Sequence, residues 1–154
     1  MKARTAVMTL LLLFVGLTMC FAANPNLGSW KLNESKSKLI AGMPRNLAVV
    51  YAAAGGSIKA TIDGVDGQGK PTHNEWTCKF DGKDYPVTGD PTSDTRAIKQ
   101  IDDHSYDLTV KKGGKVTMTG TAVISADGKT RTVTVSGTDA AGKKITATSV
   151  YDKQ

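Results

Sequence analysis

Few side chains in this sequence have the types and spacing needed for acid–base or metal chemistry. The two histidines are His73 and His104. With Glu75 they could offer imidazole and carboxylate ligands to a divalent metal such as zinc. Positions 73 and 75 share one face of a strand, but that face lies opposite Trp76 and therefore points outward. His104 falls in a predicted turn, so we interpret both histidines as surface residues and expect no metal site.

Two glycine-rich segments resemble a phosphate-binding loop. Residues 64–70 and 137–143 each hold two glycines five positions apart, followed by a lysine. Pro71 and Lys144 stand where such a loop needs a Ser or Thr for magnesium, and a strand rather than a helix is predicted to follow. We therefore interpret both segments as hairpin loops and expect no nucleotide or other cofactor.

Nucleophilic catalysis has equally little support. Cys78 alternates with Trp76 and Phe80, which places its thiol on an apolar strand face as a small buried hydrophobic group. His73 is an odd number of positions away and faces the other side of the strand. Neither histidine has a sequence context that marks a Ser-His-Asp set. We predict no catalytic residues and expect that the protein is not an enzyme.

The elements that position these side chains are predicted to be β-strands. Apolar and polar residues alternate between closely spaced turns, as in an antiparallel sheet with one buried and one wet face. One helical turn is expected within Ser35–Leu39. The pattern predicts an all-β domain. The turn signals are Gly55-Gly56, Asp66-Gly67, Asp81-Gly82, Gly113-Gly114, Asp127-Gly128 and Ala141-Gly142.

Ten strands are predicted, joined largely by short hairpins. Such an antiparallel up-and-down meander leaves two unpaired edges, and closure into a β-barrel removes both. An even number of strands makes the last antiparallel to the first, which brings Tyr151 and Lys153 near Trp30. The predicted strands are Leu27–Asn33, Asn46–Ala54, Ser57–Ile62, Thr72–Phe80, Asp84–Thr88, Thr95–Ile101, Ser105–Lys111, Lys115–Ser125, Thr130–Ser136 and Lys144–Tyr151.

Alternate connections lie at opposite ends of such a barrel. One end receives tight turns and the other receives mostly longer segments, so we expect a cup with a loop-rich mouth. Small residues at inward positions either leave room for a cavity or interdigitate with large ones in a filled core, and the sequence leaves both open. These small residues are Ala60, Cys78, Gly120, Ala122 and Ala147.

Residues 1–22 are predicted to be a cleaved secretory signal peptide. Lys2 and Arg4 precede an apolar run, and Cys20 and Ala22 supply the small residues before a cleavage site. The run is too short for a comfortable membrane span, and Cys20 leaves a lipoprotein site open. Residues 23–154 then form a single domain that is secreted or periplasmic. The chain carries a net charge of +6, but its lysines are scattered, so no nucleic-acid partner is expected.

The segment Leu27–Leu32 contains Gly-x-Trp and resembles the opening strand of lipocalins and other calycin barrels. In those families the Trp plugs the closed end and a basic residue of the last strand packs over it, a pairing that would fall on Trp30 and Lys153. Four longer segments resemble small bacterial secreted lipocalin-like proteins of uncharacterised function. The resemblance implies a lipocalin-like barrel but assigns no reaction. The segments are Leu27–Ser37, Phe80–Asp90, Ser125–Thr130 and Val150–Gln154.

Together these observations predict a secreted or periplasmic lipocalin-like protein that binds a small, largely apolar molecule in the barrel cup. Tyr51, Trp76 and Tyr106 are predicted to line the site, since aromatic rings offer apolar area and an occasional hydroxyl. The alternative is a protein-interaction or inhibitor module of the cell envelope that acts through its loops and has no ligand cavity. The identity of the ligand and the oligomeric state remain open.

Overall fold

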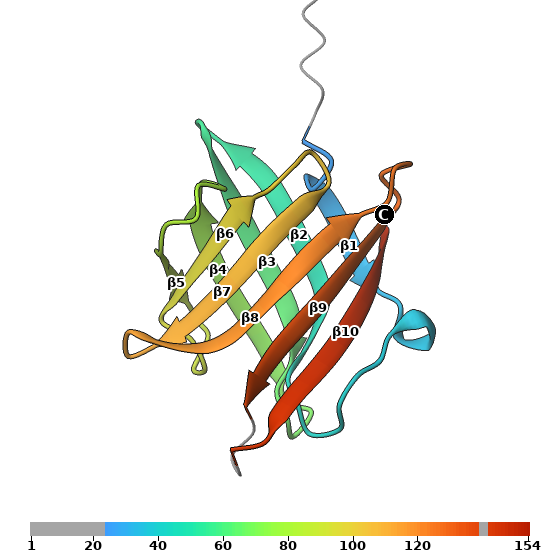
Figure 1. Cartoon of the computed structure of the whole chain (residues 1–154). Helices are drawn as coiled ribbons and strands as arrows, with labels where there is room; N and C mark the ends of the chain where they lie inside the picture. Colours follow the sequence, from blue (N-terminus) through green and yellow to red (C-terminus); the bar gives the residue numbers. More distant parts are fainter. Residues whose placement is uncertain (1–23, 139–141) are drawn as a thin grey trace, which may run out of the picture.

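The computed structural model describes residues 24–138 and 142–154, and the predicted signal peptide, residues 1–22, lies outside them. The described chain forms ten β-strands and one short 3-10 helix, η1 (Glu34–Lys36), which overlaps the predicted helical turn (Figure 1). Each predicted strand is present, with ends that differ by no more than three residues. The strands are β1 (Gly28–Leu32), β2 (Arg45–Ala54), β3 (Ser57–Val65), β4 (Pro71–Cys78), β5 (Tyr85–Thr88), β6 (Thr95–Gln100), β7 (Ser105–Lys112), β8 (Lys115–Ile124), β9 (Thr130–Thr138) and β10 (Lys144–Lys153).

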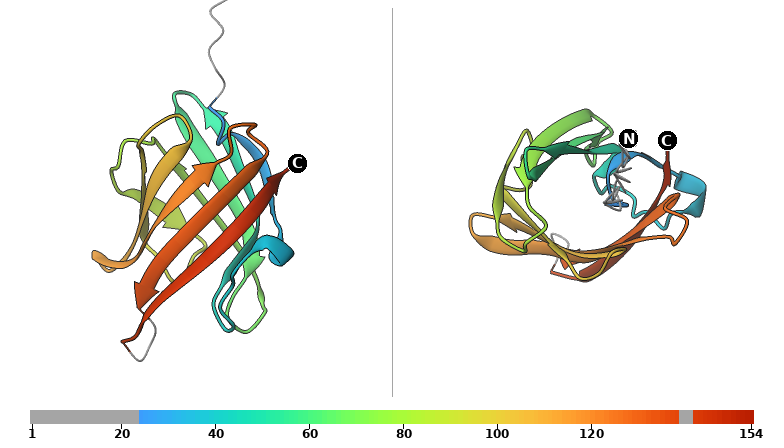
Figure 2. Two further views of the ribbon diagram at one scale, coloured as in Figure 1. Left: turned by 45° about the vertical axis from the view of Figure 1, so that its right-hand side comes forward. Right: turned by 90° about the horizontal axis from the view of Figure 1, so that it is seen from above.

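The strands form one closed, antiparallel, up-and-down β-barrel, which confirms the predicted fold class. Each strand pairs with its neighbours in the sequence, and β1 also pairs with β10, so that the strands form a ring when viewed from above (Figure 2). In the β1–β10 register Trp30 lies opposite Lys153, and Leu32 lies opposite Tyr151. Closure gives hydrogen-bond partners to the backbone groups of the two outermost strands.

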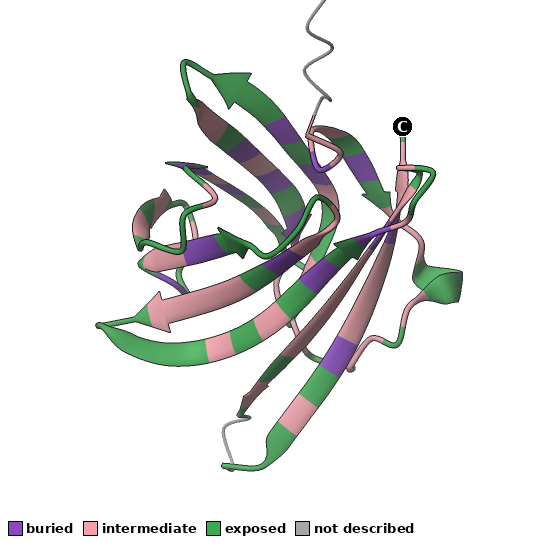
Figure 3. Ribbon diagram, turned by 45° about the horizontal axis from the view of Figure 1, so that its top comes forward, coloured by how far each residue is buried: buried purple, intermediate pink, exposed green. Residues whose placement is uncertain are grey.

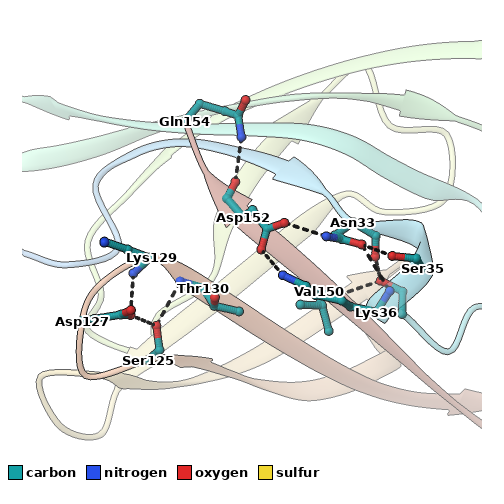
Figure 4. Close-up of polar contacts among 11 residues, drawn as sticks. Asn33, Ser35, Lys36, Ser125, Asp127, Lys129, Thr130, Val150, Asp152 and Gln154 are labelled. Carbon is teal, nitrogen blue, oxygen red and sulfur yellow. Dashed lines mark hydrogen bonds and ion pairs between the residues drawn. The ribbon is translucent and has the colours of Figure 1, made fainter.

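Polar side chains tie the segment after β1 to the outside of β10. Asp152 accepts a hydrogen bond from Asn33 Nδ2 at 2.6 Å and pairs with Lys36 Nζ at 3.0 Å (Figure 4). Asn33 also caps η1, because its side chain accepts the backbone N–H of Lys36. Lys38 then forms an isolated antiparallel bridge with Thr148. These contacts hold the start of the long β1–β2 connection against the barrel wall.

Burial follows the two-residue period of the strands (Figure 3). In β3, Ala60 and Ile62 are buried, whereas Lys59 and Asp63 are exposed. The buried side chains meet inside the barrel in one apolar cluster. Its members are Trp30, Val49, Tyr51, Ala60, Ile62, Trp76, Cys78, Ile98, Tyr106, Ala122, Ile124 and Tyr151.

Trp30 plugs the end of the barrel that carries the tight turns. Its side chain is 1% exposed, and its indole Nε1 donates a hydrogen bond to Asn26 O at 2.9 Å. Lys153 Nζ lies 5.0 Å from the centre of the Trp30 ring and donates to Pro25 O. At that distance the cation is attracted to the ring face. The contact between Trp and a basic residue of the last strand, expected from the lipocalin resemblance, is therefore present.

Candidate ligand-binding cavity

A cavity of about 230 Å³ lies inside the barrel, toward the end that carries the long connections. Its rim includes Leu39, Ile40, Met43 and Pro44 from the β1–β2 connection and residues 89–92 from the β5–β6 connection. Its walls are mainly apolar side chains of the strands, which are Val49, Ile62, Trp76, Ile98, Leu108, Val110, Met118, Val133, Val135 and Ala147. The expected mouth thus coincides with the rim of the cavity.

The barrel is filled at one end and hollow at the other. The sequence left open whether the small inward residues belong to a filled core or make room for a cavity, and both alternatives apply in part. Of the five small inward residues, Ala147 lines the cavity, whereas Ala60, Cys78 and Ala122 are completely buried in the packed core. A Cβ atom at Gly120 would lie 2.4 Å from Thr134 O. Most of these small residues therefore permit close packing and do not create the cavity.

The cavity lining includes two of the three aromatic residues that the sequence analysis predicted to bind a ligand. Tyr51 and Trp76 both line the cavity. Tyr106 is absent from the cavity lining and is 1% exposed in the packed end, where its hydroxyl donates to Asn24 Oδ1 at 2.9 Å. Phe80 packs edge-on against both Tyr51 and Tyr106, at ring-centre distances of 6.2 Å and 5.2 Å. The aromatic cluster thus runs from the packed end up to the floor of the cavity.

A buried arginine forms part of the cavity lining. Arg131 is 4% exposed, and its Nη2 donates a hydrogen bond to the Tyr51 hydroxyl at 3.2 Å. Its guanidinium carbon lies 5.2 Å from the Tyr51 ring centre and 5.8 Å from that of Tyr151. Both distances are within the range of cation–π attraction. Tyr151 in turn donates its hydroxyl to Asn46 O at 3.2 Å.

A second arginine of the lining, Arg96, is neutralised near the rim. Its Nη2 contacts Asp90 Oδ2 at 2.5 Å, and its Nη1 donates to Asn74 Oδ1 at 3.3 Å. Burial raises the pKa of Asp90, but hydrogen bonds from Ser93 and Thr92 and the charge of Arg96 outweigh it and lower the pKa to about 2. Asp90 therefore stays ionised and organises the β5–β6 connection around Arg96.

Replacing Asp90 with Asn is expected to lower the free energy of unfolding at pH 7 by about 1–2 kcal/mol, after a discount for solvent screening. The folded-state pKa of Asp90 is depressed, so its contribution is complete above the ordinary carboxyl value and is lost as the pH falls toward 2. The difference between the wild type and Asp90→Asn should therefore shrink between pH 5 and pH 2, measured by urea unfolding at each pH. Asp107→Asn, at an exposed position of β7, is the matched control. A pH-independent difference would contradict this account.

Arg96 and Arg131 line the cavity but were not among the residues predicted from the sequence. A signal for both was present, because Arg131 alternates with Val133 and Val135 on the inward face of β9, and Arg96 is in phase with Ile98 on β6. A charged residue at an inward position of an otherwise apolar strand face marks a functional candidate, since buried charges are rare without a partner.

The candidates for other chemistry lie away from the cavity. His73 is exposed on the outer face of β4, where Asp63 Oδ1 lies 2.6 Å from its Nδ1, and this hydrogen bond raises the pKa of His73. His104 lies in the β6–β7 turn. Among residues 24–138 and 142–154 no group of three His, Cys, Asp or Glu side chains is placed to hold a metal. Burial raises the pKa of the Cys78 thiol to about 11, so it is protonated at neutral pH.

Comparisons with known proteins and a search for membrane helices add two findings. The chain matches no protein-family model and no curated protein sequence. Over the described part of the chain, no helix has the length and apolar character needed to cross a bilayer.

Proposed function

We propose that this protein binds a small, largely apolar molecule in the barrel cavity. The observation that carries the proposal is the cavity of about 230 Å³ with a mainly apolar wall, which includes Tyr51 and Trp76. Ligand sites in proteins are typically concave and apolar, with a few polar groups that orient the ligand. The volume lies just below the ~300–1,000 Å³ of typical pockets, which favours a ligand of modest size.

The proposal is one of binding without chemical change. Among the described residues that line the cavity there is no histidine or cysteine, and the carboxylates, Asp66 and Asp90, lie in the connections at the rim. The arrangement therefore lacks a nucleophile paired with a general base at the place where a ligand would lie. We further propose, on the pattern of residues 1–22, that the protein is exported to the periplasm or the medium as a lipocalin-like binding protein.

The alternative, a protein-interaction module, has less support. The large hydrophobic side chains that are exposed within the described residues are spread over β2, β8 and the end of β6. A docking surface for a protein usually forms a contiguous apolar patch. These residues are Leu47, Val50, Ile101, Val116 and Val123.

The test is to fill the cavity and measure binding of a neutral apolar probe, 1-octanol, by isothermal titration calorimetry. Ala147→Phe places a ring into the cavity and is expected to weaken 1-octanol binding at least tenfold. Ala52→Phe makes the same change at an exposed position of β2 and should leave it intact. Thermal unfolding of each variant verifies that the barrel is formed. Saturable 1-octanol binding that survives Ala147→Phe, or no binding to the wild type, would overturn the proposal.

A further inference from the structure

The polar atoms of the cavity that lack a partner are all hydrogen-bond donors. Among the described residues, the buried and unpaired polar atoms of cavity-lining side chains are Trp76 Nε1, Arg96 Nε and Arg131 Nε. Each is an N–H group that gains free energy from an acceptor. An acceptor group that enters the cavity would therefore lie beside side chains whose buried N–H groups lack a partner.

Arg131 is also a buried charge without a counter-ion. In residues 24–138 and 142–154, no carboxylate lies within 4.0 Å of its guanidinium, whereas Arg96 pairs with Asp90 and Arg45 pairs with Glu34. Burial of a charge is costly unless it is paired, and the two tyrosine rings that flank Arg131 compensate for only part of that cost. An anion bound beside Arg131 would supply the missing pair.

Tyr51 adds a second donor at the same place. Its oxygen accepts the hydrogen bond from Arg131 Nη2 at 3.2 Å, and no acceptor for its own hydrogen is found in the described chain. A guanidinium N–H and a phenol O–H side by side suit the two oxygens of a carboxylate, because charge-assisted hydrogen bonds of this kind are short and strong.

We propose that the ligand is an amphipathic monoanion whose carboxylate binds Arg131 and Tyr51 and whose apolar part extends toward the mouth. This inference rests on the proposed function. Arg131 is the inward residue of β9 nearest to the plugged end, and Val133 and Val135 follow it toward the loop-rich end. The head group therefore lies at the cavity floor and the tail lies against the apolar walls.

The volume sets the length of the tail. At about 230 Å³ the cavity lies below the ~300–1,000 Å³ of typical ligand pockets, which favours a short apolar tail. A medium-chain carboxylate fills that space, with the end of its chain at the rim. Octanoate is therefore a suitable probe, and 1-octanol is its neutral counterpart of equal chain length.

The experiment compares octanoate and 1-octanol by isothermal titration calorimetry at pH 7 on the wild type, Arg131→Met, Arg131→Lys and Lys79→Met. We expect the wild type to bind octanoate at least tenfold more tightly than 1-octanol. Arg131→Met should abolish that preference while 1-octanol still binds, and Arg131→Lys should retain part of it. Lys79→Met removes the same charge from an exposed position outside the barrel and should change neither affinity.

The outcomes separate this inference from the proposed function. Equal binding of octanoate and 1-octanol by the wild type would overturn the anionic ligand and leave an apolar binding protein. Absence of binding for both probes would overturn both. A preference for octanoate that persists in Arg131→Met would assign the anion to another donor and also refute the inference. The wild-type comparison remains decisive even if Arg131→Met does not fold.

Discussion

Trp30→Ala is expected to lower the free energy of unfolding by about 3–5 kcal/mol, the largest effect of any single substitution considered for this barrel. The indole is 1% exposed and fills the plugged end, so its removal leaves a void that the closed ring of strands cannot collapse to fill. The substitution also removes the hydrogen bond to Asn26 O and the ring beneath Lys153. Urea unfolding followed by far-ultraviolet circular dichroism measures the loss.

The controls separate the volume of the indole from its polar contacts. Trp30→Phe keeps most of the apolar volume but lacks the N–H donor, so it should lose less stability than Trp30→Ala. Lys153→Met removes the cation over the ring and should cost about 1 kcal/mol or less, since cation–π contacts near a surface are weak. If Trp30→Ala unfolds at the wild-type urea concentration, Trp30 is not the plug that the structure indicates.

The barrel has a packed core at one end of its axis and a cavity toward the other. Around Trp30 and Tyr106 the interior is packed, and this half accounts for much of the buried apolar surface that drives folding. Toward the mouth the apolar walls stand apart and enclose the cavity. The side chains of Trp76 and Arg131, each with a buried N–H that lacks a partner, form part of its lining. A protein tolerates an unpaired buried charge at a functional site when the rest of the fold is stable enough to compensate.

The strands and their closure could be predicted because both follow from local sequence. The two-residue alternation of apolar and polar side chains that marks an antiparallel strand can be read directly from the sequence. Paired glycines such as Gly55 and Gly56 mark the hairpin turns, because they adopt the positive φ that these turns require. Ten consecutive strands, most of them linked by hairpins, then leave closure as the way to satisfy both edges. The contact between Trp30 and Lys153 followed from the antiparallel pairing of the first and last strands.

The depth of each inward residue could not be predicted. Alternation shows that Tyr51 and Tyr106 face inward, but their height along the barrel axis depends on strand tilt and on register across several strands. The structure places Tyr51 at the cavity and Tyr106 in the packed end. The clustering of basic residues along the sequence does not reveal Arg131, because what distinguishes this residue is the inward strand face that it occupies.

Gly120→Ala is expected to lower the free energy of unfolding by about 1–3 kcal/mol, as overpacking does in a well-packed interior. Glycine in a strand is normally about 0.5–1 kcal/mol less stable than alanine, so the same change without a clash would stabilise the protein. At position 120 a Cβ atom would lie 2.4 Å from Thr134 O and 2.9 Å from Val135 Cγ1, so β8 and β9 must move apart.

Gly137→Ala is the matched control on the same pair of strands. Its Cβ atom would lie 3.0 Å from Thr117 O, a contact that a shift of a few tenths of an ångström relieves, so its loss should be smaller than that of Gly120→Ala. Because closure makes every strand pair part of one ring, widening the β8–β9 pair at position 120 should weaken the whole barrel cooperatively. Equal stability of the two variants in urea unfolding would show that close approach at position 120 is not what this glycine provides.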